Sequence, residues 1–287
     1  MNEATIAKDS DMRAPVSGTV DRADGAQLRW WRVGHGEPVV LVHGSFDDHQ
    51  SWSPLVSQLS GRADLTSYDR RGHSASSEPR GQGSIRADAE DLLAVLDTVV
   101  GGPAHLVGHS YGASVVLLAA VLRRDAVRSV AAYEPPLYGL LDHNPVAKVF
   151  GAETGVWMAH AAELIRSGNP GQGARVYVEK VGIGKGSWEG LFTREQRMTM
   201  VSNAYTWLDQ YNDPSGRSVD IGTLSWARFP ITLVAGERSW ELNKLVISEL
   251  AERLPLARNV TLPGAGHAGH LTHPAELAAA LAPQLRA

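Results

Sequence analysis

Residues 104–112 read AHLVGHSYG, and this stretch decides the fold. It is a short apolar strand that runs into a Gly-x-Ser-x-Gly pattern centred on Ser110, and the apolar run 113–122 follows directly. A serine at such a tight strand-to-helix turn projects its hydroxyl from the sheet, and the flanking glycines let the helix approach the strand closely. Because the new helix begins there, its free N–H groups point at whatever the serine attacks. We therefore interpret Ser110 as a nucleophile; an ordinary strand–loop–helix corner is the alternative.

Around this stretch, short apolar strands alternate with helical segments. We expect strands at 39–42, 64–68, 104–107, 127–133, 229–235 and 259–262. We expect helices from about residue 51, over 84–99, over 241–254 and from 274, and a hairpin over 18–33. Alternation of this kind is typical of a mostly parallel sheet that is covered by helices on both faces. The fold class is therefore predicted to be α/β.

The alternation stops between residues 137 and 228, where helical segments, a glycine-rich piece and four of the eight tryptophans occur. We expect a flexible tail (1–15), a core in two parts (16–136 and 229–287) and an inserted helical cap (137–228). Each tryptophan alone fits a small core within the cap, but together they favour an apolar substrate pocket. The expected substrate-binding side chains are Phe46, Trp157, Trp188 and Trp207.

Three further motifs carry a resemblance to a known family. They are VVLVHGSF at 39–46, YDRRGHSAS at 68–76 and LPGAGH at 262–267. In this order they resemble the α/β-hydrolase fold superfamily, except that Ser74 stands where glycine is commoner. The resemblance runs from residue 39 to the end of the chain, and it implies a cap over the active site. The closest likeness is to serine esterases and lactonases.

The resemblance implies roles for the residues around Ser110. His267, on the loop after the last strand, is the expected general base, because imidazole can accept the proton that makes the serine hydroxyl nucleophilic. The expected oxyanion hole combines the backbone N–H of Tyr111 with that of Ser45, and Phe46 is the alternative second donor.

The triad acid departs from the commoner family pattern. Most relatives carry Gly-x-x-Asp after the seventh strand, but here residues 236–239 read GERS, with Ser239 in place of the aspartate. A subset of the family takes the acid from the end of the strand that follows the nucleophile helix, and Glu134 occupies that position. We therefore expect Glu134 to be the acid, with Glu237 or Glu241 as alternatives.

Histidines in the predicted site region raise the question of a metal. His270 and His273 follow His267 at three-residue intervals, but no acidic residue lies near them in the sequence and cysteine is absent. We interpret His43 and His109 as structural or supporting residues. The sequence therefore predicts neither a metal site nor a cofactor.

The composition excludes several classes of function. A net charge of −4 gives no reason to expect nucleic acid or an anionic membrane as a partner, and the absence of cysteine excludes disulfides and thiolate catalysis. The first fifteen residues lack the apolar core of a signal peptide, and no run is long enough to span a bilayer. We expect a cytoplasmic protein, as a monomer or a homodimer.

The sequence predicts a hydrolase that cleaves a small apolar carboxylic ester or lactone through a serine acyl-enzyme. A serine rather than an aspartate at position 110 argues against epoxide hydrolases and haloalkane dehalogenases. Carbon–carbon bond hydrolases and thioesterases remain alternative functions because they use the same triad. A ligand-binding or biosynthetic protein of this fold with little turnover is a further alternative.

Overall fold

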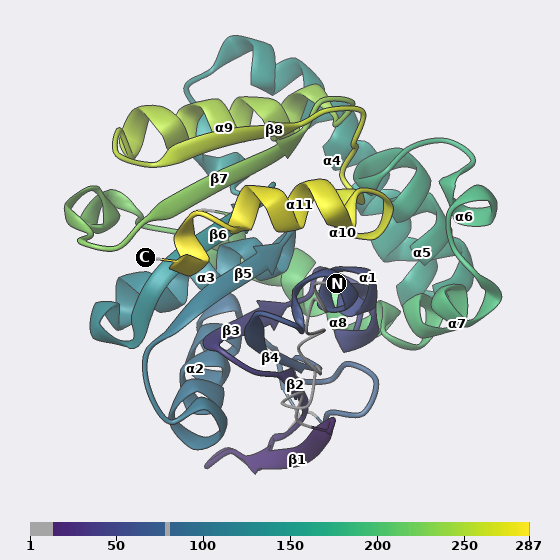
Figure 1. Cartoon of the computed structure of the whole chain (residues 1–287). Helices are drawn as coiled ribbons and strands as arrows, with labels where there is room; N and C mark the ends of the chain where they lie inside the picture. The colour runs from purple at the N-terminus through teal and green to yellow at the C-terminus, as the bar shows by residue number, and fades with distance from the viewer. Residues whose placement is uncertain (1–13, 78–80, 218, 287) are drawn as a thin grey trace, which may run out of the picture.

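The computed structural model describes residues 14–77, 81–217 and 219–286. Most of the expected tail, 1–13, lies outside these residues. One sheet of eight strands crosses the molecule in the order β1-β2-β4-β3-β5-β6-β7-β8 (Figure 1). The strands are β1 (Val16–Asp21), β2 (Gln27–Gly34), β3 (Glu37–Val42), β4 (Ala63–Tyr68), β5 (Ala104–His109), β6 (Val127–Tyr133), β7 (Ile231–Gly236) and β8 (Arg258–Leu262). Only the pairings β1–β2 and β2–β4 are antiparallel, which confirms the predicted mostly parallel sheet.

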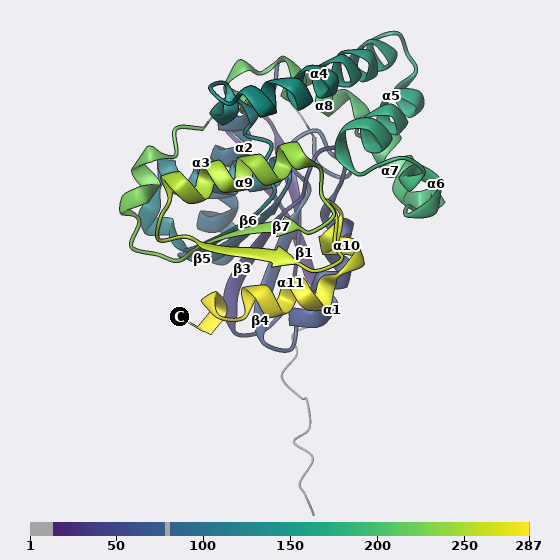
Figure 2. The same cartoon turned by 90° about the horizontal axis from the view of Figure 1, so that it is seen from above.

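Helices cover both faces of this sheet, as Figures 1 and 2 show. They are α1 (Ser53–Leu59), α2 (Ile85–Val95), α3 (Tyr111–Leu122), α9 (Glu241–Arg253), α10 (Gly269–Thr272) and α11 (Pro274–Leu281). Because successive side chains of a strand point to opposite faces, β3 contributes to two cores. Val40 and Val42 pack in the core that includes α2, α3 and α9, while Val39 and Leu41 pack in the core that includes α1 and α11. Burial on both faces explains why the central strands are apolar throughout.

Local signals set several of the element boundaries. The predicted hairpin joins β1 to β2 through a turn at Asp24-Gly25, and Gly25 has a φ of 94° that favours glycine. Ser84 caps α2 by accepting a hydrogen bond from the N–H of Ala87 at 3.2 Å. The α-helical hydrogen bonding of α2 ends at Val95, and a π-helical turn continues it to Val100. The predicted helix over 84–99 therefore covers both pieces.

Between β6 and β7 the described residues form helices and loops and no strand. The principal helices are α4 (Pro145–Arg166), α5 (Pro170–Tyr177), α6 (Ser187–Gly190), α7 (Arg194–Ser202) and α8 (Ala204–Asn212). They gather at one end of the sheet (Figure 2). Phe46, from the loop after β3, packs against Tyr177 and Trp207 of this cap, with ring centroids 4.9 and 5.6 Å apart. The cap therefore lies over the edge at which the parallel strands end. No helix in the described part of the chain has the length and apolar character needed to cross a bilayer.

Candidate active site

The turn between β5 and α3 holds Ser110 in a strained conformation. Its φ of 53° and ψ of −124° lie in a region that non-glycine residues rarely adopt. The flanking glycines leave no space for a side chain, because a Cβ atom on Gly108 would lie 2.3 Å from the carbonyl oxygen of Gly112. One on Gly112 would lie 2.2 Å from the carbonyl oxygen of Val42. Ser110 is 5 % exposed. The close packing of β5, α3 and β3 therefore fixes the backbone that presents the serine.

A glutamate and a histidine from distant parts of the sequence meet beside this turn. The Oε2 atom of Glu134 lies 2.6 Å from Nδ1 of His267, and its Oε1 atom accepts a hydrogen bond from the N–H of Gly236 at 2.7 Å. Glu134 follows β6 directly and has a φ of 49°, so its backbone is strained as well. Burial raises the pKa of this carboxyl, but the hydrogen bond and charge of His267, together with the neighbouring Ser239 hydroxyl and Gly236 N–H, outweigh burial and lower it. Glu134 is therefore placed to accept a hydrogen bond from Nδ1–H of His267.

The alternative acids make other contacts. Glu237 accepts a hydrogen bond from the N–H of Gly264 at 2.7 Å. Oε2 of Glu241 lies 4.0 Å from Nζ of Lys244 on the same helix. Ser239, where most relatives carry an aspartate, is buried and makes no hydrogen bond to the His267 ring. Among the described residues, the carboxylate bonded to Nδ1 of His267 is thus that of Glu134, directly after β6, and not one that follows β7.

The sequence analysis missed Asn243 in the first turn of α9. Its Nδ2 atom donates to Oε2 of Glu134 at 3.1 Å and lies 3.3 Å from Nδ1 of His267. Its Oδ1 atom accepts a hydrogen bond from the hydroxyl of Tyr138 at 3.0 Å. Asn243 is 4 % exposed, and the only signal for it was an amide among the apolar positions of an amphipathic helix. It holds the Glu134 carboxylate from the side opposite Gly236.

Ser110 and His267 line one cavity of about 40 Å³. No hydrogen bond joins Oγ of Ser110 to the His267 ring in this structure, which describes both residues. Catalytic hydrogen bonds are often long without substrate, so shared placement in one cavity is the relevant observation. The other walls are largely apolar and come from the cap and the last loop, with Val178, Ile183, Phe192, Met200 and Leu271 among them.

Two predicted backbone donors lie next to Ser110. Tyr111 is the first residue of α3, where an N–H group has no acceptor within its own helix, and its side chain turns away to donate to Asp88 at 3.2 Å. The β3 loop contacts the nucleophile, since a Cβ atom on Gly44 would lie 3.2 Å from Cβ of Ser110. The hydroxyl of Ser45 donates to Oε1 of Gln210 at 2.5 Å. Only the backbone N–H of Ser45 thus remains to meet an oxyanion.

The aromatic residues of the cap divide between a core and a second cavity. Phe46 and Trp207 are buried and pack together, and Phe46 lines the 40 Å³ cavity while Trp207 lines a larger one of about 550 Å³. Trp188 and Trp157 line neither cavity. Trp188 is buried in the core of the cap. Trp157 packs against Lys180, whose Nζ atom lies 4.8 Å from the ring centroid of the tryptophan. These two tryptophans pack against other residues of the cap, and contact between them and a substrate stays a prediction.

The larger cavity adjoins the smaller one. Ser45 and Tyr177 line both, and Tyr111 lines only the larger one. Its remaining walls mix aromatic and apolar side chains with polar ones. The first kind includes Tyr138, Met158, Trp207, Tyr211 and Leu242, and the second includes Thr154, Gln210, Asn212 and Arg217. Of the two predicted oxyanion donors, Ser45 thus lies where the two cavities meet, and Tyr111 lies on the larger one.

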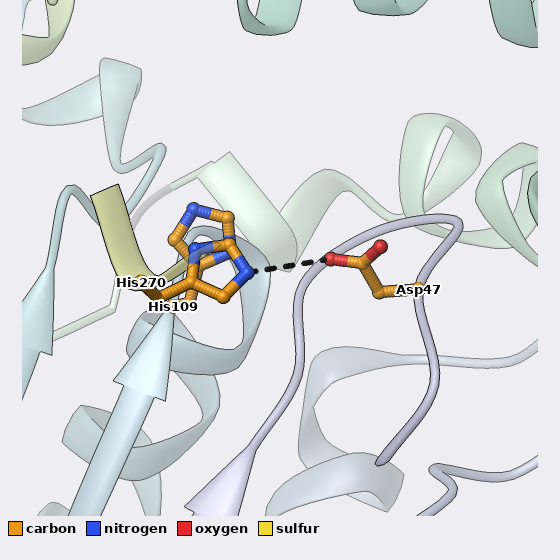
Figure 3. Close-up of side chains that lie close together, drawn as sticks. All are labelled: Asp47, His109 and His270. Carbon is orange, nitrogen blue, oxygen red and sulfur yellow. Dashed lines mark ion pairs between the residues drawn. The ribbon is translucent and has the colours of Figure 1, made fainter. Parts of the chain in front are cut away.

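Two groups of histidine and aspartate have the spacing of metal ligands among the described residues. Asp48, His49 and Asp69 are held by hydrogen bonds, including a contact of 2.7 Å between Nδ1 of His49 and Oδ1 of Asp69. Asp47, His109 and His270 form the second group, and Figure 3 shows the two rings side by side with the carboxylate facing them. All three also line the 40 Å³ cavity.

Predicted supporting roles fit two of the other histidines. His43 is fully buried, its Nε2 atom accepts a hydrogen bond from the N–H of Arg70 at 2.9 Å, and burial holds its pKa well below the usual range. Nε2 of His109 lies 2.8 Å from the carbonyl oxygen of His267 and so ties the strand end to the last loop. His273 bonds to neighbouring Thr272 and lines neither cavity.

Comparison with known proteins agrees with this fold. A profile of the Alpha/beta hydrolase family matches residues 39–280. An α/β hydrolase from Sphaerobacter thermophilus superposes with a TM-score of 0.77 at 26% identity, over 93% of this chain and 99% of that one. The enol-lactonase from Burkholderia xenovorans superposes with a TM-score of 0.74 at 19% identity, over 91% and 97%.

A curated relative matches over a shorter stretch. (E)-2-((N-methylformamido)methylene)succinate hydrolase from Acinetobacter baylyi is 27% identical over 116 residues, which are 40% of this chain and 44% of the relative. The match thus spans less than half the length of that relative.

Proposed function

We propose that this chain, which belongs to the alpha/beta hydrolase family, cleaves a carboxylic ester or lactone through an acyl-enzyme on Ser110. The single observation that carries the proposal is the 2.6 Å contact between Glu134 and Nδ1 of His267, next to the strained serine. A carboxylate that accepts a hydrogen bond from Nδ1–H fixes the tautomer in which Nε2 is a base, and it stabilises the imidazolium that forms during the reaction.

The reaction proceeds in two steps. Nε2 of His267 takes the proton of the Ser110 hydroxyl as Oγ bonds to the carbonyl carbon, and the resulting oxyanion is met by the N–H groups of Tyr111 and Ser45. The bond to the leaving group then breaks, and its oxygen receives the proton from His267. In the second step His267 takes a proton from water, the hydroxide adds to the acyl carbon, and Ser110 leaves with the proton.

The two cavities support a substrate with a small alcohol and a larger acyl group. The leaving oxygen must lie next to His267, which lines only the 40 Å³ cavity, so this cavity receives the alcohol. The 550 Å³ cavity beyond Ser45 then receives the acyl group, and its aromatic walls favour an apolar or aromatic chain. A lactone fits the same arrangement only when its ring is small.

The isomers methyl phenylacetate and benzyl acetate test this orientation. They contain the same atoms, but the ring lies on the acyl side in the first and on the alcohol side in the second. Each methylene that is fully buried adds about 0.8 kcal/mol, so we expect kcat/KM for methyl phenylacetate to be at least about tenfold higher. The reverse preference would mean that the assignment of the two cavities is wrong.

A phosphonate ester probe tests the nucleophile independently of substrate choice. We expect it to label the wild-type protein at Ser110 and to leave Ser110→Ala unlabelled, while both proteins unfold at similar temperatures. Turnover is then measured with a generic aryl ester: release of many equivalents of product supports an enzyme, and release of one equivalent supports a ligand-binding relative. Labelling that persists in Ser110→Ala would remove Ser110 from the mechanism.

A further inference from the structure

The group formed by Asp47, His109 and His270 leaves buried polar atoms without partners. Nδ1 of His109 and both ring nitrogens of His270 make no hydrogen bond, although the two side chains are buried. The Asp47 carboxylate makes no hydrogen bond within the described residues, and its nearest partner is Nε2 of His270 at 4.0 Å (Figure 3). Unbonded buried polar groups are costly, and in native proteins they usually indicate a bound water, ion or ligand.

The hydrogen bond of His109 fixes its tautomer. Its Nε2 atom lies 2.8 Å from the carbonyl oxygen of His267, which can only accept, so Nε2 carries the proton and Nδ1 keeps its lone pair. No partner in the described residues uses that lone pair. A neutral imidazole nitrogen of this kind is a metal ligand.

The neighbouring group of Asp48, His49 and Asp69 provides an internal comparison. Its members have the same spacing, but their polar atoms are already used: Asp48 accepts from the N–H of Gln50, and Asp69 accepts from the ring and the N–H of His49. That group holds the loop after β3 together and offers few lone pairs to a ligand. The distances between the ligand atoms are therefore alike in the two groups. Only the hydrogen bonds show that the first group has free lone pairs and that the second has few.

We propose that Asp47, His109 and His270 bind one divalent transition-metal ion of the Zn²⁺ class. Two neutral imidazoles and one carboxylate form a donor set that suits Zn²⁺, Co²⁺ or Fe²⁺ better than Mg²⁺ or Ca²⁺. The ligand atoms lie within 4.8 Å of one another, so bonds of about 2.0–2.2 Å require them to move inward slightly. Asp47 can make that movement because its carboxylate is tied to nothing else and lies on the loop after β3.

The position of this site links it to the cavity of Ser110. All three ligands line the 40 Å³ cavity, which has more than the roughly 10–15 Å³ that one water needs. An ion bound there occupies the space that we assign to the alcohol of the substrate. The metal therefore acts as a reversible inhibitor that competes with ester. Binding itself does not depend on the proposed hydrolase activity.

The test measures binding directly on the full chain after treatment with a chelator and its removal. Titration with Co²⁺ should produce visible d–d absorption that saturates at one ion per chain, and calorimetry with Zn²⁺ should give the same stoichiometry. We expect Asp47→Asn and His270→Gln each to weaken binding by at least about tenfold. His273→Gln is the matched control, because His273 directly follows the short helix α10 that carries His270, and it should bind like the wild type.

Several results would overturn the proposal. They are an absence of saturable binding to the wild type, binding that neither Asp47→Asn nor His270→Gln weakens, and binding that only His267→Gln abolishes. The last would place the ion on the histidine opposite Ser110 instead. If both ligand variants misfold, X-ray absorption at the zinc edge of the wild type still decides: two imidazoles in the first shell support the site, and one or none contradicts it.

Discussion

Two histidines that line the cavity of Ser110 each have a carboxylate nearby, and the two pairs differ in how completely they are bonded. His267 and Glu134 are 2.6 Å apart, and Gly236 and Asn243 complete the bonding of the carboxylate. His270 and Asp47 are 4.0 Å apart, and neither side chain has a hydrogen bond within the described residues. A pair whose partners are all present is held in one geometry and one tautomer. A pair without partners keeps its lone pairs for something that enters the cavity.

The largest expected effect concerns the bonded pair. His267→Ala should lower kcat by a factor on the order of 10⁴ or more, as loss of the nucleophile should, because base and nucleophile act as a unit. Steady-state kinetics on an aryl ester measures this loss. His273→Ala, which removes a histidine outside both cavities, should keep kcat within about twofold. If instead His273→Ala lost activity to the same extent, the base would be misassigned.

The next effect separates the acid of the bonded pair from its alternative on β7. Glu134→Gln keeps the shape but removes the charge, so we expect kcat to fall by about a hundredfold or more with little change in KM. Glu237→Gln is the matched control, because its carboxylate bonds to the N–H of Gly264 rather than to His267. Its kcat should change by less than about tenfold. A larger loss in Glu237→Gln than in Glu134→Gln would contradict the contact seen here.

Asn243 tests whether the bonding around Glu134 matters in addition to its charge. Asn243→Ala removes one hydrogen bond to the carboxylate but leaves its charge and its bond to Gly236. We expect kcat to fall by roughly tenfold with KM nearly constant, since a hydrogen bond to a charged carboxylate contributes about 1.5 kcal/mol or more. Asn243→Asp should be worse than Asn243→Ala, because it sets a second carboxylate against the first. Equal activity of the two variants would show that Asn243 only fills space.

The comparison also shows what the sequence could predict. The strands, the turn at Ser110 and the position of Glu134 at the end of β6 follow from local patterns, and these parts of the fold are confirmed. The grouping of Asp47 with His270 was not predictable, because a loop after β3 meets a loop after β8 only once the sheet is assembled. The absence of an acidic residue near His270 in the sequence therefore said nothing about its neighbours in space.

The cap was the least predictable region. Its helical character follows from the loss of strand–helix alternation, but which tryptophans face the cavities depends on how α4 to α8 pack together. Trp188 is buried in the core of the cap, and Trp207 reaches a cavity wall, although both are aromatic residues on cap helices. Composition predicts an apolar lining here without identifying the residues that form it.

The smallest expected effect is on the pH dependence of stability. Ionisation of Glu134 stabilises the folded state, whereas ionisation of Asp47 destabilises it. The pKa of Glu134 is lowered by its contact with His267, so its ionised form stabilises the folded state above the unfolded pKa of about 4.3. That stability is lost as pH falls through the folded pKa. The deficit in melting temperature of Glu134→Gln relative to the wild type should therefore be largest near neutral pH and shrink in acid.

For Asp47 the sign reverses. Burial and the nearby charge of Asp48 raise the pKa of the Asp47 carboxyl to about 7 in the folded protein. In the unfolded chain an aspartate has a pKa of about 3.9. Between these values the folded state binds more protons than the unfolded state, so stability falls as pH rises, and the loss is complete above the folded pKa. Asparagine does not ionise, so Asp47→Asn should gain melting temperature relative to the wild type from about pH 4 to about pH 8. Thermal unfolding with a chelator present measures both differences across this range. A difference for Asp47→Asn that is flat with pH, or that falls as pH rises, would mean that the Asp47 carboxylate has a partner after all.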